Sequence, residues 1–386
     1  MPKISYLAKL EFFIVSLLTI LFMTLNKIEN AFFELLRIAL GTQEKMTVAL
    51  NDAEWKDVAQ MAVKQSVLGI LFTAVETLPE EQRPYNDLYI DMYKWVDTIE
   101  QRNEHMNKLT ASVSNRFRKD GFPNCILKGQ GVALLYPKPL RRHSGDIDIW
   151  LKGERKDIYE YVKKINKEAK SSYHQIKFTL KGGTLLEVHY TPSVSYNPFI
   201  NSRLQKWFEK QHALQIQNTI SINSENQTIS VPTSEFNAVY MLHHSLRHLL
   251  SERLSMKQVI DYFYVLNNLS NNSNTTASSF TQIQKEIDDL GMTKFSASLS
   301  WIMWIVLGLP KEKLITPPHE KSGQKLIRHI IDTSDKKVTE DEADSQLSKD
   351  FNNAKPFFTT YPNEALWYPL LSLGSKVWHG IKRDRF

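Results

Sequence analysis

The chain has 386 residues, of which 42% are hydrophobic and 23% are charged, an ordinary globular composition. This length provides a core of useful size and suits one large domain or two to three smaller ones. The single cysteine, Cys125, excludes an internal disulfide, and its apolar neighbours predict a buried thiol. The net charge of +6 is common among proteins that handle nucleotide phosphates or RNA, but many cytosolic proteins share it. Charge therefore leaves nucleic-acid binding open.

The first 30 residues form an apolar N-terminal extension whose role the sequence leaves open. Phe12 to Leu25 is an uncharged run, shorter than the roughly 20 residues that a membrane-spanning helix needs. No small-x-small cleavage site follows it, as a signal peptide would require. Three interpretations remain: a mis-assigned start with Met23 as the true one, a membrane anchor, or a signal peptide. We expect a cytoplasmic protein, or one that residues 12–25 hold at a membrane.

Residues 31–121 are predicted to be helical. The segment from Asn30 to Gly41 reads as an amphipathic helix closed by glycine. A second, long helix carries apolar residues at three- and four-residue spacing from Leu88 to Phe117, and Gly121 ends it. These aromatic and methionine positions predict core packing.

Residues 122–230 change in character and predict a small α/β unit. Period-two alternation and short apolar runs predict strands, and a charged amphipathic helix is expected at 154–169. Gly182-Gly183 predicts a hairpin between the last two strands. The expected strands cover 124–127, 146–151, 174–180 and 185–190.

Residues 231–386 are predicted to be helical again, with helices at 235–250, 254–267, 280–289 and 293–307. The Asn/Ser/Thr-rich stretch from 267 to 279 reads as a linker without regular structure. Residues 336–350 read as a solvated loop or an exposed helix. The fold class is therefore α+β: a small sheet with its helices, flanked by N- and C-terminal helical regions.

Two aspartates at the start of a predicted strand carry the main chemical signal. Residues two apart on a strand project to one face, so Asp146 and Asp148 point together. Two carboxylates on one face repel each other unless a cation lies between them. Mg²⁺ prefers such oxygen ligands together with substrate phosphates, and two ions about 3.5–4 Å apart can stabilise an in-line displacement. The alternative is a solvated strand face.

A third carboxylate lies in the last predicted strand of this unit. Glu187 and His189 share one face, because Leu186 and Val188 alternate away from them. A glutamate inside an apolar strand is unusual unless it is paired or lies at an edge. Glu187 is therefore a candidate third metal ligand.

In this pattern the sequence resembles a known family. The matching pieces, in order, are Leu127-Lys128-Gly129, Tyr136-Pro137, Arg142, Gly145-Asp146-Ile147-Asp148-Ile149 and Glu187-Val188-His189-Tyr190. Together they resemble the uncharacterised bacterial nucleotidyltransferase family of the polymerase-β-like nucleotidyltransferase superfamily. The resemblance extends from about residue 31 to residue 266. It implies a polymerase-β-like sheet at 122–230.

The resemblance also implies roles for individual residues. Asp146, Asp148 and Glu187 would be catalytic and would hold Mg²⁺, two ions in all, with Glu187 as the base for the acceptor hydroxyl or close to it. The backbone of Gly129-Gln130-Gly131 would approach the triphosphate of an NTP such as ATP. The usual Gly-Gly or Gly-Ser pair of the superfamily is here Gly129-Gln130, and the distance to Asp146 is longer than usual. Further nucleotide-binding residues would be Lys128, Arg142 and Ser144.

The implied reaction transfers a nucleoside monophosphate from NTP to an acceptor hydroxyl and releases pyrophosphate. The acceptor could be a small molecule, a protein side chain or an RNA end. The alternative is a non-catalytic nucleotide-binding or scaffold protein that retained the fold. A membrane-tethered regulator would be a third class, and it depends on residues 12–25 alone.

Two helical patterns in the C-terminal region remain. His244 and His248 lie four apart, a spacing that suits zinc, but no third ligand is apparent, and we expect a polar helix face turned toward the active-site cleft. Arg253, Lys257 and Asp261 also recur every four residues. They predict either a surface salt-bridged face or a face that contacts phosphate or the acceptor.

Overall fold

The computed structural model describes residues 25–223, 225–272, 275–332 and 346–370. The apolar run at 12–25 lies almost entirely outside these residues, as does much of 336–350. Within the described part, every helix is too short or too polar to cross a bilayer. The mixed α+β class is as predicted, and the cytoplasmic location stays a prediction.

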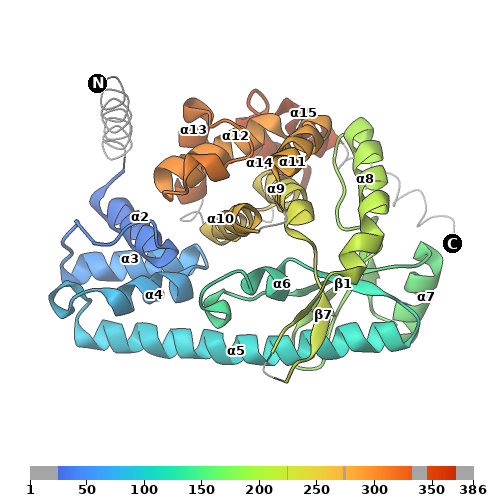
Figure 1. Cartoon of the computed structure of the whole chain (residues 1–386), viewed down its shortest axis with the longest axis horizontal. Helices are drawn as coiled ribbons and strands as arrows, with labels where there is room; N and C mark the ends of the chain where they lie inside the picture. The colour runs from blue at the N-terminus through green and yellow to red at the C-terminus, as the bar shows by residue number, and fades with distance from the viewer. Residues whose placement is uncertain (1–24, 224, 273–274, 333–345, 371–386) are drawn as a thin grey trace.

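The N-terminal helices are arranged around one very long helix. Figure 1 shows α5 running along one side of the molecule, with α2, α3 and α4 beside one end and the sheet beside the other. Asn26 and Asn51 begin α2 and α3 with capping boxes, which satisfy free backbone N–H groups at each start. The bounds are α2 Lys27–Leu40, α3 Asp52–Lys64, α4 Leu68–Thr77 and α5 Asn86–Lys119.

The central unit is a five-stranded sheet with the strand order β1-β2-β5-β4-β3. β2 and β5 are parallel, and the other pairs are antiparallel. Gly182 and Gly183 both have positive φ values in the predicted hairpin between β4 and β5. The strands are β1 Asn124–Leu127, β2 Ile147–Leu151, β3 Lys170–Ser171, β4 Gln175–Thr179 and β5 Leu185–His189.

Three further helices and a small two-stranded sheet complete this unit. The helix predicted at 154–169 is shorter, at 155–165, and the elements after β5 lacked a sequence prediction. Asn197 caps α8 by accepting hydrogen bonds from two backbone N–H groups. The elements are α6 Gly129–Ala133, α7 Arg155–Ile165, α8 Pro198–Gln217, β6 Thr219–Ser221 and β7 Thr228–Ser230.

The C-terminal helices lie across the sheet from α5 (Figure 1). Arg37 of α2 donates a hydrogen bond to the carbonyl of Val306, so the N- and C-terminal regions pack directly on each other. One apolar core runs through both regions, and a second lies between the sheet, α5 and α7. The bounds are α9 Ser234–Ser251, α10 Met256–Asn271, α11 Ala277–Asp289, α12 Thr293–Trp301, α13 Glu320–Asp332, α14 Gln346–Ala354 and α15 Pro362–Ala365.

The linker predicted at 267–279 is wrong over most of its length. α10 continues to Asn271, because Leu269 is fully buried and Lys313 donates hydrogen bonds to the side chains of Asn267 and Asn271. α11 then begins just after Thr276, whose side chain caps it. The prediction of a linker was based on polar composition alone and missed the apolar, buried face of α10.

Candidate functional site

The candidate site is organised by the pairing of β2 with β5. In this parallel pair Asp148 is the direct register partner of Glu187. Their neighbours Ile149 and Val188 point into the core, and both are completely buried. The period-two pattern therefore places Asp148, Glu187 and His189 together, and one ligand atom from each lies within 4.8 Å of the other two. This convergence was predicted for Asp148 and Glu187.

The carboxylate of Asp148 contacts a lysine and a histidine side chain. Its Oδ1 atom lies 2.9 Å from the Lys128 ammonium and 2.8 Å from Nε2 of His189. Burial alone would raise the pKa of Asp148, but Lys128 and His189 outweigh it and hold that pKa well below its ordinary value. Lys128 reaches Asp148 because it follows Leu127, the register partner of Asp148 on β1. Asp148 is therefore a buried, ionised carboxylate.

Glu187 differs from Asp148 in its electrostatic surroundings. Its only ion-pair partners within 4.0 Å in the described chain are the half-exposed Lys177, at 3.7 Å, and His189, at 3.9 Å. Burial, followed by the charge of Asp148, raises the pKa of Glu187. The two facing carboxylates therefore have their pKa values moved in opposite directions.

Asp146 lies just outside the strand that was predicted to contain it, since β2 begins at Ile147. It is partly exposed and does not belong to the three-residue cluster. It lines a small cavity of about 100 Å³ together with Asp148. The α/β unit contributes Lys128, Gly129, Arg142, Gly145, Asp146 and Asp148 to this cavity, and α9 and α10 contribute Met241, His244, His248, Lys257, Gln258 and Asp261. Asp148 is thus shared by the cavity and the cluster with Glu187 and His189.

The glycine-containing turn after β1 borders the cavity at one glycine and permits close packing at another. Gly129 has φ +39° and lines the cavity. A Cβ on Gly131 would lie 2.9 Å from the Val231 side chain, so this glycine permits close packing. The Gln130 side chain is buried and donates a hydrogen bond to Asn107 of α5. Of the three residues expected to approach a triphosphate, only Gly129 borders the cavity.

Arg142 has a partner that the sequence did not predict. Its guanidinium forms two hydrogen bonds with Asp261, at 2.7 and 2.8 Å, and Tyr136 donates a third to the same carboxylate. Arg142 and Asp261 are both buried. This geometry does not favour the prediction that Arg142 binds phosphate. Ser144 is buried too, and its hydroxyl has no hydrogen-bond partner in the described residues.

Comparison with known proteins identifies the family. The sequence model of a family described as an uncharacterised nucleotidyltransferase matches residues 51–303. The chain belongs to this family. The match runs from α3 through the sheet to α12, so it includes every residue of the candidate site but not α2. No curated protein matches the chain.

One solved structure with some likeness is an antigenic nucleotidyltransferase-like protein from Paracoccidioides brasiliensis. It is 16% identical and covers 48% of this chain and 90% of its own, with a TM-score of 0.30. The correspondence is too loose for individual residues of the two proteins to be equated.

The histidine-containing face of α9 turns toward the cavity, as predicted. His244 and His248 of α9 both border the cavity, with ring centroids 4.3 Å apart. His248 also contacts Glu252, at 2.9 Å. Within the described part of the chain, the two histidines have no further metal-ligating residue close enough to form a three-ligand site with them. The pair is therefore part of the polar wall of the cavity.

The sequence alone does not define the roles of Lys257, Asp261 and His189 in this site. Lys257 and Asp261 line the cavity, so the surface salt-bridged interpretation of their four-residue spacing is wrong for both. Arg253, which precedes α10, instead donates a hydrogen bond to the carbonyl of Lys64. His189 contacts Asp148. The sequence could have indicated this contact, because His189 shares a strand face with Glu187.

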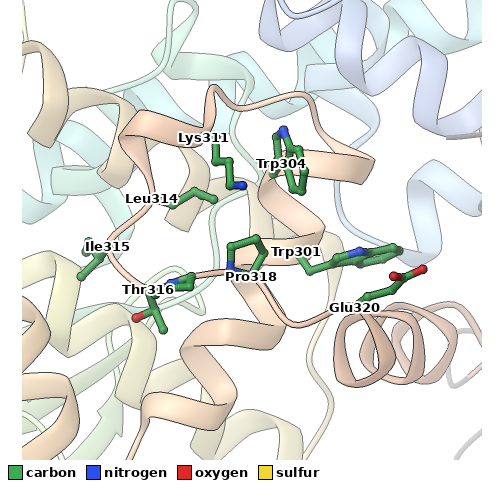
Figure 2. A pocket seen from close by; sticks show the side chains of 9 residues that line it. Trp301, Trp304, Lys311, Leu314, Ile315, Thr316, Pro318 and Glu320 are labelled. Carbon is green, nitrogen blue, oxygen red and sulfur yellow. The ribbon is translucent and has the colours of Figure 1, made fainter. Parts of the chain in front are cut away.

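A second, larger cavity of about 470 Å³ lies among the C-terminal helices (Figure 2). Its lining includes Trp301, Trp304, Pro318 and Lys311, whose ammonium lies 4.8 Å from the centre of the Trp304 ring. Glu320 is the one carboxylate that borders it among the described residues. This cavity does not share any residue with the carboxylate site.

Proposed function

We propose that the protein transfers a nucleoside monophosphate from an NTP, such as ATP, to an acceptor hydroxyl and releases pyrophosphate, with Mg²⁺ as cofactor. The observation that carries this proposal is the register pairing of Asp148 with Glu187, beside a cavity that Asp146 and Asp148 line. Family membership supports the reaction class. The acceptor class remains open between a small molecule, a protein side chain and an RNA end.

The donor atoms at this site fit a divalent cation. Carboxylate oxygens of Asp148 and Glu187 lie within 4.8 Å of each other and of a His189 ring nitrogen. Oxygen-rich sites suit Mg²⁺, which usually keeps several waters and substrate phosphates in its shell. Asp146 and Asp148 would hold the cations, two in all, with Glu187 completing one shell. Such ions neutralise developing charge on phosphate oxygens.

Glu187 is the residue that we assign to the acceptor hydroxyl. Its raised pKa, caused by burial and by Asp148, makes its carboxylate a stronger base than an exposed glutamate. Asp148 is held ionised by Lys128 and His189 and is unsuited to accepting a proton. Glu187 would therefore take the acceptor proton or hold the acceptor close to it.

The charges in the cavity indicate where the triphosphate would lie. Lys128 pairs with Asp148, and Arg142 pairs with Asp261. This leaves Lys257 and Asp146, the two cavity-lining charges in the described chain for which no ion-pair partner lies within 4.0 Å. Burying a cation without a partner is costly, and burial, followed by Arg142, lowers the pKa of Lys257.

A metal–triphosphate complex offers charges that complement both of these residues. Its cation suits Asp146, and its phosphate oxygens suit Lys257. We therefore assign Lys257 to the triphosphate. We assign Arg142 and Asp261 to support of the cavity wall.

The alternative is a nucleotide-binding scaffold without turnover. The Lys128–Asp148 ion pair gives it some support, because an aspartate neutralised by lysine does not by itself require a metal. Differential scanning fluorimetry with each NTP, with and without Mg²⁺, distinguishes the two. The proposal expects Mg²⁺-dependent stabilisation by NTP in the wild type and its loss in Asp148→Asn. Stabilisation by NTP that neither Mg²⁺ nor this substitution alters would favour the scaffold.

A further inference from the structure

Lys128 has an unusual backbone conformation for a residue with a side chain. Its φ of 51° and ψ of −137° belong to a region in which glycine is favoured. Such conformations are strained and persist where the surroundings fix them. Here the residue after β1 must turn sharply into α6 while its side chain stays beside Asp148. A glycine would relieve the strain but could not supply a cation.

The Lys128 ammonium lies where a metal ion would have to bind. It is 2.9 Å from Oδ1 of Asp148, and the same oxygen contacts His189 at 2.8 Å. The Lys128 side chain is only 14% exposed and that of Asp148 only 2%. Oδ1 therefore already has two close partners, and a metal ion that binds this oxygen would have to replace the Lys128 ammonium.

We infer that Lys128 is a resident counter-cation that occupies the carboxylate site in the nucleotide-free protein and leaves Asp148 when a metal-bound triphosphate enters. This inference depends on the proposed metal–nucleotide site. Lys128 stabilises the buried carboxylate at rest, so that Asp148 need not be protonated or exposed to water. Its new partner would be a phosphate oxygen, which enters together with the cation that replaces it.

The consequence is that metal and triphosphate bind cooperatively. A free divalent cation has to displace the Lys128 ammonium without providing it with a new anion. A metal accompanied by a triphosphate provides both the cation and the anion. By linkage, each ligand then raises the affinity for the other by the same factor. Lys128 is thus a positioning residue that prevents the site from binding bare metal.

The test is Mn²⁺ binding to the nucleotide-free protein, measured by electron paramagnetic resonance of free Mn²⁺. We expect weak binding to the wild type and at least about tenfold tighter binding to Lys128→Met, since ten-fold corresponds to about 1.4 kcal/mol. Lys177→Met is the matched control, because Lys177 lies beside the other carboxylate of the cluster, 3.7 Å from Glu187, and is half-exposed. It measures the general effect of removing a nearby positive charge.

A second variant covers the case in which Lys128→Met fails to fold. Lys128→Gly removes the cation and also relieves the positive-φ strain, and it should bind Mn²⁺ as tightly as Lys128→Met. Equal Mn²⁺ affinity in wild type, Lys128→Gly and Lys177→Met would overturn the inference. Adding inorganic tripolyphosphate should tighten Mn²⁺ binding in the wild type far more than in Lys128→Gly.

Asp148→Asn separates this inference from the proposed function. Combined with Lys128→Gly, it should abolish the tighter Mn²⁺ binding, because the vacated carboxylate is then missing. If Asp148→Asn changes Mn²⁺ binding in neither background, the metal site itself is wrong and the proposed function fails with it. If Asp148→Asn abolishes binding but removal of Lys128 has no effect, the metal site stands and the counter-cation role is wrong.

Discussion

Asp148 and Glu187 face each other across the parallel strands β2 and β5, yet only Asp148 carries a lysine partner at hydrogen-bonding distance. Lys128 and His189 outweigh burial and lower the pKa of Asp148, whereas burial, followed by the charge of Asp148, raises the pKa of Glu187. One carboxylate is thereby fixed in its charged form, and the other is the better proton acceptor. The predictions below follow from this difference and from the charges around it.

Asp148→Asn and Asp146→Asn should differ in stability, although both should lose metal-dependent activity. Asp148→Asn leaves the Lys128 ammonium buried without its counter-charge, which should lower the free energy of unfolding by about 3–5 kcal/mol. Asp146 has no ion-pair partner within 4.0 Å in the described chain and is partly exposed, so Asp146→Asn should change the free energy of unfolding by no more than about 0.5 kcal/mol. Urea denaturation without divalent cations measures both. Equal destabilisation would contradict the assigned ion pair.

This expectation corrects a simpler one from the sequence. Two aspartates on one strand face predict mutual repulsion, so that replacing either by asparagine would leave the melting temperature level or raise it. The structure places a lysine from the preceding strand end beside one of them. Loss of that ion pair outweighs any relief of repulsion at Asp148.

Glu187→Gln should separate binding from turnover. The amide keeps the shape of the side chain but can neither accept a proton nor bind a cation as strongly. NTP binding in the presence of Mg²⁺ should stay within about threefold of wild type, while turnover should fall by about 10²–10⁴-fold, as for loss of a general base. Calorimetry and single-turnover kinetics provide the two readouts. Turnover within a few fold of wild type would rule Glu187 out as the base.

Lys257→Ala should weaken NTP binding. Among the described residues, Lys257 is the one lysine or arginine of the cavity wall that has no carboxylate within 4.0 Å, so it is available to pair with phosphate. The loss should be about 1.5–3 kcal/mol, the usual contribution of a hydrogen bond to a charged group. Arg253→Ala is the matched control, because Arg253 lies four residues earlier, between α9 and α10, and outside the cavity lining, and this variant should bind NTP as the wild type does. If both variants lose the same affinity, the effect is general electrostatics and not phosphate contact.

Arg142→Ala should act mainly on stability. The buried Asp261 carboxylate would lose two hydrogen bonds, at a cost of about 3–5 kcal/mol. A double-mutant cycle with Asp261→Asn should show strong coupling, because each substitution breaks the same ion pair. Purely additive effects, or normal stability with a large loss of NTP affinity, would restore Arg142 as a phosphate ligand.

Stability should also depend on pH through Glu364 of α15, far from the carboxylate cluster in sequence. Burial raises its pKa to about 7, although Ser195 and the Tyr196 backbone N–H donate to it. The folded protein then holds a proton that the unfolded chain releases near pH 4.3. The stabilising contribution is therefore complete below about pH 4.3 and is lost as pH rises to about 7. Glu364→Gln should flatten this part of the melting-temperature profile, and an unchanged slope would show that another group is responsible.

Much of the site was predictable from sequence because strand periodicity is local. Asp148, Glu187 and His189 follow from alternation along two strands, and the structure only had to place those strands side by side. Asp261 and Lys257 were ambiguous, because a four-residue spacing fits a cavity wall as well as a surface. The partners of Arg142 and Lys128 depend on contacts between distant segments, which local patterns do not encode. The same limit explains why the sequence did not predict α8 or the continuation of α10 to Asn271.

The most direct test of the central claim is the fate of the α-phosphate of the nucleotide. Purified protein would be incubated with Mg²⁺, cell extract and NTPs labelled either at the α- or at the γ-phosphate, with Asp148→Asn in parallel. Nucleotidyl transfer predicts an acceptor labelled from the α-position only, pyrophosphate carrying the γ-label, and neither product with Asp148→Asn. Labelling of the acceptor from the γ-position, or α-label transfer that persists in Asp148→Asn, would contradict the account.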